Sequence, residues 1–322
     1  MQENNILEVS GLTTEFHTLS GTVRAVNDVS FSLRKGETLG IVGESGCGKS
    51  VTALSIMRLL DRRFGHAYGE YIRFQDQDLL TLSDKQIQNV RGNEIAMIFQ
   101  EPMTALNPVF SIGNQIGEAL EKHLGLRGRE KKQRCIELLR SVNIPRPEKI
   151  VTEYPHQLSG GMRQRVMIAM ALSCHPCLLI ADEPTTALDV TIQAQILELL
   201  QRIIREQAMS VMFITHDLGV IAEMADRVIV MYAGRIMEVV PVRELFAAPA
   251  HPYTIGLLHS RPSLVAKGHK LTCIPGMVPS LLDMPPGCPF ADRCPRAEAD
   301  CRSSLPELRE IAPGHAVRCF HA

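Results

Sequence analysis

The sequence lacks three features that would assign it to a nucleic-acid-binding, membrane-spanning or secreted protein. Its 322 residues carry a formal net charge of −1, so there is no basic field of the kind that holds nucleic acid. No apolar run approaches the roughly 18 residues that cross a bilayer. The first ten residues, MQENNILEVS, do not have the basic and then apolar order of a secretion signal. We therefore expect a protein that works in the cytosol and binds no nucleic acid.

Cysteine and proline are unevenly distributed along the chain. Nine cysteines in a reducing compartment do not predict a disulfide framework, but five of the nine lie at Cys273 or later. Twelve of the nineteen prolines fall in the last 82 residues, where long periodic segments stop. These shifts place a boundary near residue 240. They separate a large domain of residues 1–240 from an irregular accessory region of residues 241–322.

Five short apolar runs rich in Ile, Val, Leu and Phe recur in the large domain, with helical patterns between them. Such runs are typical of the strands of a mainly parallel sheet, which are buried on both faces. From Glu101 to Ser159 the runs stop and helical spacing takes over, which indicates a helical insertion over about residues 101–165. The sequence thus predicts an α/β fold. The predicted strands are residues 38–42, 95–99, 177–181, 211–215 and 227–232.

The clearest motif is GESGCGKS at residues 43–50, which fits the phosphate-loop pattern G-x-x-x-x-G-K-[ST]. An apolar run precedes it and a helical pattern follows it, as the pattern requires. Backbone amides of the loop and the N-terminus of the next helix would hold phosphates. Lys49 is the candidate for the β- and γ-phosphates, and Ser50 for Mg²⁺. The other predicted nucleotide-binding residues of the loop are Gly43, Glu44, Ser45, Gly46, Cys47 and Gly48.

Further candidates follow other predicted strands. One strand runs into Asp182 and Glu183, a pair suited to holding the Mg²⁺ shell and to orienting the attacking water. Gln100 follows a second strand and His216 a third. Because ligands gather at the carboxyl ends of parallel strands, we expect these side chains to share a site with Lys49.

In chain order, GESGCGKS, Gln100, LSGGM, LLIADEP, ALD ending at Asp189, and THD around His216 resemble the motifs of the nucleotide-binding subunit of an ABC transporter. The resemblance covers roughly residues 6–240 and implies a P-loop NTPase ABC cassette with a helical subdomain. It implies ATP hydrolysis with Mg²⁺. The family's signature turn is LSGGQ, and Met162 here replaces the Gln, as is common in the peptide-transport branch.

The resemblance also assigns roles to single residues. Phe16 matches the aromatic residue that stacks on adenine, with His17 as a weaker candidate. Gln100 matches the residue that contacts the metal and the attacking water and links to the membrane subunits. His216 matches the switch histidine that contacts the γ-phosphate, and Asp189 matches the loop that communicates across a dimer.

The signature turn raises the question of a second anion site in one chain. Its amides at the start of a helix would bind an anion, while the simpler alternative is an ordinary helix with a serine cap. A cap does not need two glycines, and the phosphate loop already surrounds one triphosphate. The turn would therefore serve a nucleotide held by another subunit, with two cassettes packed head to tail. It consists of Leu158, Ser159, Gly160, Gly161 and Met162.

The accessory region is similar to that of dipeptide, oligopeptide and nickel importer ATPases, in HPYTIGLL at residues 251–258, IPGMVPSL and GCPFADRC. This implies an ATPase that powers peptide import from the cytoplasmic face of the membrane. Its implied partners are a second ATPase subunit, by resemblance a paralogue, two membrane-spanning permease subunits and an extracytoplasmic binding protein. A nickel or other small-solute importer is the alternative. A soluble ABC ATPase acting on nucleic acid or ribosomes is disfavoured, since there is one cassette and no basic excess.

Four cysteines of this region form a candidate metal site. Five, six and seventeen residues separate them, which matches neither the paired spacing of zinc sites nor the common ferredoxin run. A proline-rich segment has little core of its own, and a metal would supply the missing cross-links. Zinc, an iron–sulfur cluster and free thiols remain open on spacing, and the importer resemblance implies a [4Fe–4S] cluster. The four are Cys288, Cys294, Cys301 and Cys319.

Overall fold

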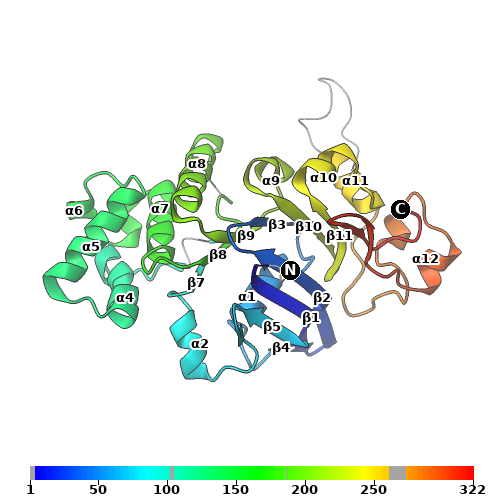
Figure 1. Cartoon of the computed structure of the whole chain (residues 1–322), viewed down its shortest axis with the longest axis horizontal. Coiled ribbons are helices and arrows are strands. Elements are labelled where there is room, and N and C mark those ends of the chain that lie inside the picture. Colours follow the sequence, from blue (N-terminus) through cyan, green and yellow to red (C-terminus); the bar gives the residue numbers. More distant parts are fainter. Residues whose placement is uncertain (1–3, 102–104, 187, 261–272) are drawn as a thin grey trace. The chain divides into compact units, whose positions relative to one another are not determined.

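The structure is a computed structural model that describes residues 4–101, 105–186, 188–260 and 273–322 (Figure 1). The chain forms two compact units. The first comprises Met1–Leu33, Thr38–Leu80 and Ile214–Ala322, and the second comprises Arg34–Glu37 and Thr81–Phe213.

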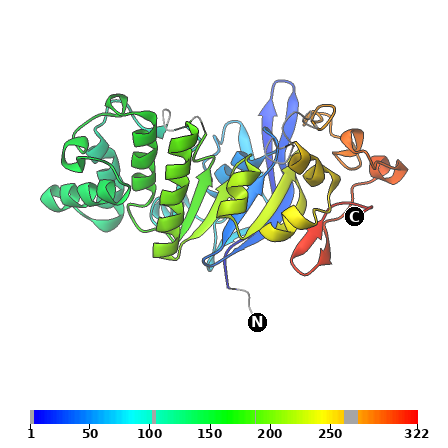
Figure 2. The same cartoon turned by 90° about the horizontal axis from the view of Figure 1, so that it is seen from above.

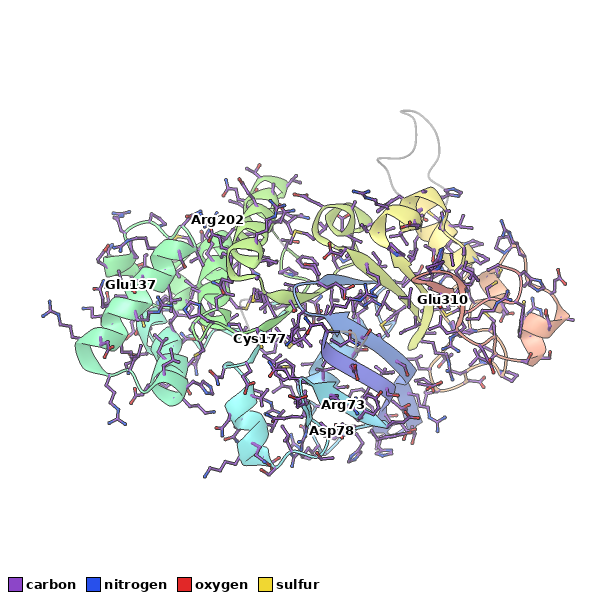
Figure 3. All side chains as sticks on the ribbon, viewed as in Figure 1. Arg73, Asp78, Glu137, Cys177, Arg202 and Glu310 are labelled. Atoms are coloured by element: carbon purple, nitrogen blue, oxygen red, sulfur yellow. The ribbon has the colours of Figure 1, made fainter. Side chains whose placement is uncertain are left out.

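An antiparallel sheet occupies the N-terminal part of the first unit. Its strands are β1 (Asn5–Thr18), β2 (Gly21–Arg34), β4 (Gly65–Tyr68), β5 (Tyr71–Phe74) and β6 (Gln77–Asp78). They are ordered β2-β1-β5-β6, and β4 also pairs with β1. Arg73 of β5 faces Asp78 of β6 across their hairpin (Figure 3). The second half of β2 alternates between buried and less buried residues, as expected for a strand covered on one face.

A second group of strands in this unit leads to the phosphate loop. In order across the sheet they are β12 (Arg309–Ala312), β13 (His315–Val317), β11 (Arg235–Pro241), β10 (Arg227–Tyr232) and β3 (Thr38–Val42). β3 and β10 are parallel, whereas β11 is antiparallel to both β10 and β13. All five residues of β3 are buried, as its continuous apolar sequence predicts.

The accessory region contains short elements of its own and joins the sheet of the first unit through β13. Glu238 of β11 is fully buried, and its carboxylate lies 2.7 Å from the Nε2 atom of His315. The backbone amides of Ala250 and His251 donate to the same carboxylate. A buried carboxylate requires such partners, so Glu238 fixes both β13 and the segment before the next helix. The helices of this unit are α1 (Lys49–Ile56), α9 (Leu218–Met224), α10 (Val242–Ala247), α11 (Pro252–His259), the 3₁₀ turn η3 (Ala291–Arg293) and α12 (Ala299–Ser303).

The second unit has three fully buried strands, ordered β9 (Ser210–Ile214), β8 (Leu178–Asp182) and β7 (Ile95–Ile98). β7 and β8 are parallel. Together with β3 and β10, these strands confirm the five predicted from apolar runs, each with ends within one residue of the prediction.

Helices make up most of the second unit. α4, α5 and α7 pack on one another and lie together in both views (Figures 1 and 2). Serine and aspartate side chains cap several helices, which is why α4 begins after Ser111, α7 after Ser159 and α8 after Asp189. The elements are α2 (Asp84–Val90), α4 (Ile112–Leu124), α5 (Gly128–Ser141), α6 (Pro147–Ile150), the 3₁₀ turn η1 (Pro155–Gln157), α7 (Gly160–Ala171) and α8 (Val190–Gln207).

Candidate active site

The loop of residues 43–50 joins β3 to α1, as the strand–loop–helix pattern predicts. Gly43, Gly46 and Gly48 have positive φ angles of 152°, 78° and 102°. A β-carbon at Gly43 would lie 2.2 Å from the carbonyl oxygen of Met231. The loop therefore needs glycine both for its backbone conformation and for space.

Lys49 begins α1 and is only 6% exposed. Its ammonium donates to the carbonyl oxygens of Gly43 at 2.8 Å and of Glu44 at 3.1 Å. A lysine at a helix N-terminus beside a glycine-rich loop forms a site for a highly charged anion. The loop thus fits the triphosphate of a nucleotide, and Ser50 stands in the same helical turn, where Mg²⁺ is predicted to bind.

The carboxyl ends of β7 and β8 bring Gln100 and Glu183 together. The strands are parallel neighbours with Ile98 opposite Ala181, so the residues that follow leave the sheet at the same edge. Gln100 Nε2 donates to Glu183 Oε2 at 3.1 Å, and Thr186 Oγ1 donates to the same oxygen at 2.8 Å. Thr186 is not among the predicted residues. The one sequence feature that could have indicated this contact is its position three residues after Glu183.

The two adjacent acids have different environments. Asp182 ends β8 and is 4% exposed, whereas Glu183 is half-buried. Glu183 has a φ angle of 46°, in a region that non-glycine residues rarely adopt. A buried carboxylate suits a metal ion, and a half-exposed one suits a water molecule.

The signature turn caps α7. Ser159 Oγ accepts a hydrogen bond from the Met162 amide at 3.4 Å. A β-carbon at Gly161 would lie 2.8 Å from Ile192 Cγ2 of α8, so this glycine permits close packing of two helices. Among the described residues, the atom nearest to a β-carbon at Gly160 is Leu188 Cδ2 at 3.9 Å, so Gly160 has room for a ligand.

Asp189 lies close to this turn through the same residue of α8. Its carboxylate accepts from the Ile192 amide at 3.0 Å and caps α8, while the Ile192 side chain lies against Gly161. The residue Ala187 of the ALD motif lies outside the described residues. Asp189 is therefore linked to the signature helix through Ile192, while its role in communication across a dimer stays a prediction.

Phe16 and His216 lie in the first unit. Phe16 is half-buried on β1, opposite Gly65 of β4, where a β-carbon would come 2.8 Å from the ring. His17 and His216 are both exposed, and His216 follows β9. The roles of Phe16 and His216 toward a nucleotide stay predictions.

Four thiols line one small cavity in the accessory region, those of Cys288, Cys294, Cys301 and Cys319. Three of them are buried and Cys294 is half-buried. The Cys288 amide donates to the Cys301 carbonyl at 2.8 Å, which joins two of the segments. Burial raises the pKa of the Cys288 thiol to about 11 and also raises the pKa values of Cys294 and Cys301. These thiols stay protonated at neutral pH unless a metal replaces the proton.

A second potential donor set lies beside this cavity. The carboxylate of Asp300, the thiol of Cys301 and the imidazole of His321 are all within 4.8 Å of one another. This trio includes only one of the four predicted thiols and one exposed acid. It is therefore a poorer match to a buried structural metal than the four-thiol set.

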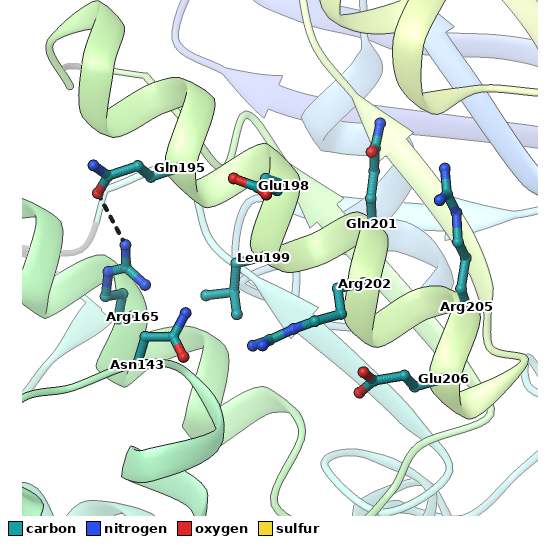
Figure 4. Close-up of a pocket in the computed structure, with 9 residues that line it drawn as sticks. All are labelled: Asn143, Arg165, Gln195, Glu198, Leu199, Gln201, Arg202, Arg205 and Glu206. Atoms are coloured by element: carbon teal, nitrogen blue, oxygen red, sulfur yellow. Dashed lines mark hydrogen bonds between the residues drawn. The ribbon is translucent and has the colours of Figure 1, made fainter.

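A separate hollow of about 820 Å³ lies along α8 (Figure 4). Charged side chains of both signs line it, including Arg165, Glu198 and Arg202. Arg165 donates to Gln195 Oε1 at 3.1 Å. None of the predicted site residues lines this hollow, so we do not assign it to the nucleotide.

Two residues of the accessory region contact the phosphate loop and were not predicted. Tyr253 of α11 accepts a hydrogen bond from the Glu44 amide at 2.8 Å, and Arg293 of η3 forms a bidentate ion pair with the Glu44 carboxylate. These partners are 209 and 249 residues apart in the chain. Tyr253 lies in the HPYTIGLL motif and Arg293 in GCPFADRC, but neither motif indicates a contact with the phosphate loop.

The fold and the loop define the class of protein, a P-loop nucleoside triphosphatase. A family model described as "ABC transporter" matches residues 26–186, and one described as "Oligopeptide/dipeptide transporter, C-terminal region" matches residues 237–301. The oligopeptide transport ATP-binding protein AppD of Bacillus subtilis is 52% identical, over 98% of this chain and 97% of its own length. The dipeptide transport ATP-binding protein DppD of the same organism is also 52% identical, over 98% and 94%.

Solved structures agree with this class. The dimeric ATP-binding cassette MJ0796 bound to ADP and phosphate matches with a TM-score of 0.66 and 27% identity, over 74% of this chain and 99% of that one. The chain belongs to the ABC transporter family as an ATP-binding subunit, which confirms the resemblance inferred from the motifs. In the part of the chain that the structure describes, no helix combines the length and apolarity needed to cross a bilayer.

The reactivity of the Cys47 thiol tests whether this residue of the phosphate loop is buried as the structure shows. Burial raises the pKa of its thiol, although the Lys49 ammonium acts in the opposite direction. Since the thiolate is the form that reacts with iodoacetamide, we expect alkylation of Cys47 to be slow at pH 7 and to rise about tenfold per pH unit toward pH 9. Mass spectrometry would follow the reaction, with the exposed Cys273 as the internal reference. ATP binding should fall in step with Cys47 alkylation; rapid modification at pH 7, or ATP binding by the alkylated chain, would contradict this.

Proposed function

We propose that this chain hydrolyses ATP to drive the import of di- or oligopeptides through membrane-spanning partner subunits. The names of its AppD and DppD relatives and the match of residues 237–301 support a peptide substrate. In this proposal residues 1–240 are the nucleotide-binding domain, with a helical subdomain at about 101–165, and residues 241–322 are the importer-type extension. The observation that carries the hydrolytic part is the hydrogen-bonded pair of Gln100 and Glu183.

In the proposed reaction water attacks the γ-phosphorus of ATP, and ADP and phosphate are released. Glu183 accepts a hydrogen bond from the water and polarises it. Gln100 and Thr186 hold the Glu183 carboxylate in place, since both donate to its Oε2 atom. His216 contacts the γ-phosphate, which completes the proposed catalytic set.

Binding of ATP falls to a separate group of residues. The amides of residues 43–50 and the Lys49 ammonium hold the triphosphate, and Phe16 stacks on adenine. Ser50 and Asp182 provide the oxygen ligands that Mg²⁺ prefers. Mg²⁺, when bound, neutralises charge that develops on the phosphates.

The proposed assembly pairs this chain with a second ATPase subunit, which we take to be a paralogue. The open space at Gly160 and the cap at Ser159 support a role for the signature turn at the partner's nucleotide. Two permease subunits and an extracytoplasmic binding protein complete the importer, and this chain lies peripherally on the cytoplasmic face of the membrane. Selectivity for a particular peptide then lies with the binding protein and the permeases.

A nickel or other small-solute importer is the alternative within the same class. A soluble ABC ATPase acting on nucleic acid or ribosomes is disfavoured by the net charge of −1. Purification of the chain from its native source separates these classes. An importer subunit brings hydrophobic membrane proteins with it, whereas the other class brings nucleic acid.

Replacing the proposed water-polarising acid should separate binding from hydrolysis. We expect Glu183→Gln to keep ATP binding and to lower turnover about 100-fold or more in the full complex, with the closed dimer trapped. Lys49→Ala is the contrasting variant and should impair ATP binding itself. Near-normal ATPase activity in Glu183→Gln would remove Glu183 from this role.

The signature turn should act on the partner's nucleotide. In a mixed dimer, Ser159→Ala in one subunit should reduce ATP photolabelling at the site whose phosphate loop is in the other subunit. Ser111→Ala is a matched control, because Ser111 also caps a helix and should cost similar helix stability without affecting nucleotide. Damage at the mutant subunit's own Lys49 site would show that the head-to-tail arrangement is wrong.

We propose that the four-thiol cavity holds a [4Fe–4S] cluster with a structural role, with Zn²⁺ as the alternative. The four thiols line one common cavity, and four thiolates can hold either group. The resemblance to peptide-importer ATPases, which the match of residues 237–301 supports, favours the cluster.

Anaerobically purified protein should be brown and contain iron and acid-labile sulfide. Cys294→Ala should lose the colour and the iron, while Cys273→Ser should keep both, because Cys273 does not line the four-thiol cavity. Colourless protein with one zinc per chain would decide for the alternative. Protein with neither metal would remove the site.

A further inference from the structure

Glu44 of the phosphate loop is held by the accessory region at two points. Arg293 donates to both carboxylate oxygens, from Nη1 at 2.7 Å and from Nη2 at 3.0 Å. Tyr253 accepts from the Glu44 amide at 2.8 Å. A bidentate arginine–carboxylate pair fixes orientation as well as distance, so the loop is constrained at this residue in both its backbone and its side chain.

Arg293 is itself locked by other partners. It is 7% exposed, and its Nε atom donates to the Pro275 carbonyl at 2.9 Å. Its Nη1 atom also donates to the Tyr232 hydroxyl at 3.2 Å. Its guanidinium lies over the aromatic rings of Tyr232 and Phe290, 5.7 and 5.9 Å from their centroids. A buried guanidinium keeps its charge and needs a fixed acceptor, and the Glu44 carboxylate is that acceptor. The hydrogen bond to Glu44 raises the pKa of Arg293 further above its ordinary range.

The constraint on Glu44 reaches the phosphate-binding lysine. The peptide group between Gly43 and Glu44 donates through its N–H to Tyr253, and through its C=O it accepts from Lys49 Nζ at 2.8 Å. The next carbonyl, that of Glu44, accepts from the same ammonium at 3.1 Å. Holding Glu44 therefore fixes the two carbonyl groups that hold Lys49.

The turn that carries Arg293 is part of the four-thiol region. The Ala291 amide donates to the Cys288 carbonyl at 3.0 Å, and the Arg293 amide donates to the Phe290 carbonyl at 3.0 Å. Cys294 follows Arg293 directly. The position of Arg293 is thus set by a short turn that lies between two of the cavity cysteines.

We propose that Arg293 is a positioning residue for the phosphate loop, acting through Glu44, so that the turn between Cys288 and Cys294 helps to set the affinity for ATP. This goes beyond the proposed function, which assigns the accessory region no part in binding nucleotide, and it rests on ATP binding at this loop. Arg293 touches neither phosphate nor metal in this role; it fixes the loop that does.

The test is the affinity of the full-length chain for MgATP, measured by titration calorimetry. We expect Arg293→Ala to weaken binding about tenfold, which corresponds to the loss of one charge-assisted pair. Arg293→Lys should recover part of this loss, because an ammonium makes one of the two hydrogen bonds. In the importer complex, KM for ATP should rise while kcat at saturating ATP stays nearly constant, since bound ATP restores the loop.

Arg302→Ala is the matched control, because Arg302 forms an exposed ion pair with Asp292 of the same turn. It should leave MgATP affinity unchanged. A double-mutant cycle with Glu44→Ala shows whether Arg293 acts through Glu44: the double variant should bind no more weakly than either single variant. Additive losses would overturn the proposal, because they would mean a general structural effect.

The remaining outcomes are also decisive. Unchanged affinity in a folded Arg293→Ala chain overturns the proposal. If that variant does not fold, the test uses Glu44→Gln, which keeps the shape of the side chain and removes its charge. Normal MgATP affinity in Glu44→Gln would also overturn the proposal. A wild-type chain that does not bind MgATP would instead overturn the proposed function, and the two failures are distinguishable by this measurement.

Discussion

Close approach of backbone to backbone is the constraint on which the phosphate loop depends. At Gly43 a β-carbon would reach to 2.2 Å from the Met231 carbonyl oxygen, and at Gly48 to 2.4 Å from that of Ala25. β10 and β2 therefore press directly against the loop, and no side chain fits between them. The same closeness buries Lys49 and leaves its ammonium surrounded by backbone carbonyl groups. A site for phosphate arises here from missing side chains as much as from present ones.

The two glycines of the signature turn look equivalent in the sequence but have different roles in the structure. The sequence treats Gly160 and Gly161 alike, as evidence for an anion site. In the structure Gly161 is required by the packing of α7 against Ile192 of α8, whereas the described residues leave open space at Gly160. A pair of glycines at a helix start thus combines a packing requirement with room for a ligand.

Much of the fold and of the candidate site could be predicted, for physical reasons that also explain what was missed. β3, β7, β8, β9 and β10 are buried on both faces, so each appears as a continuous apolar run. The antiparallel sheet of β1 and β2 mixes buried and exposed residues and has no such run. β12 is exposed along its whole length, and its four residues, REIA, contain no apolar run of strand length. Gln100 and Glu183 could be paired because parallel strands end at one edge, whereas no rule of spacing joins Arg293 to Glu44.

The pairing of Arg293 with Glu44 has a consequence for the order in which the protein matures. The loop is synthesised 249 residues before the arginine that holds it, and Glu238 likewise precedes its partner His315 by 77 residues. At ribosomal rates of about 5–20 residues per second, the acid of the loop waits roughly 12–50 s for its partner. A nascent cassette therefore carries an incompletely held loop until the turn that bears Arg293 has left the ribosome. Premature termination between Tyr253 and Arg293 would release a chain with every nucleotide motif present, but with the Glu44 carboxylate lacking its arginine partner.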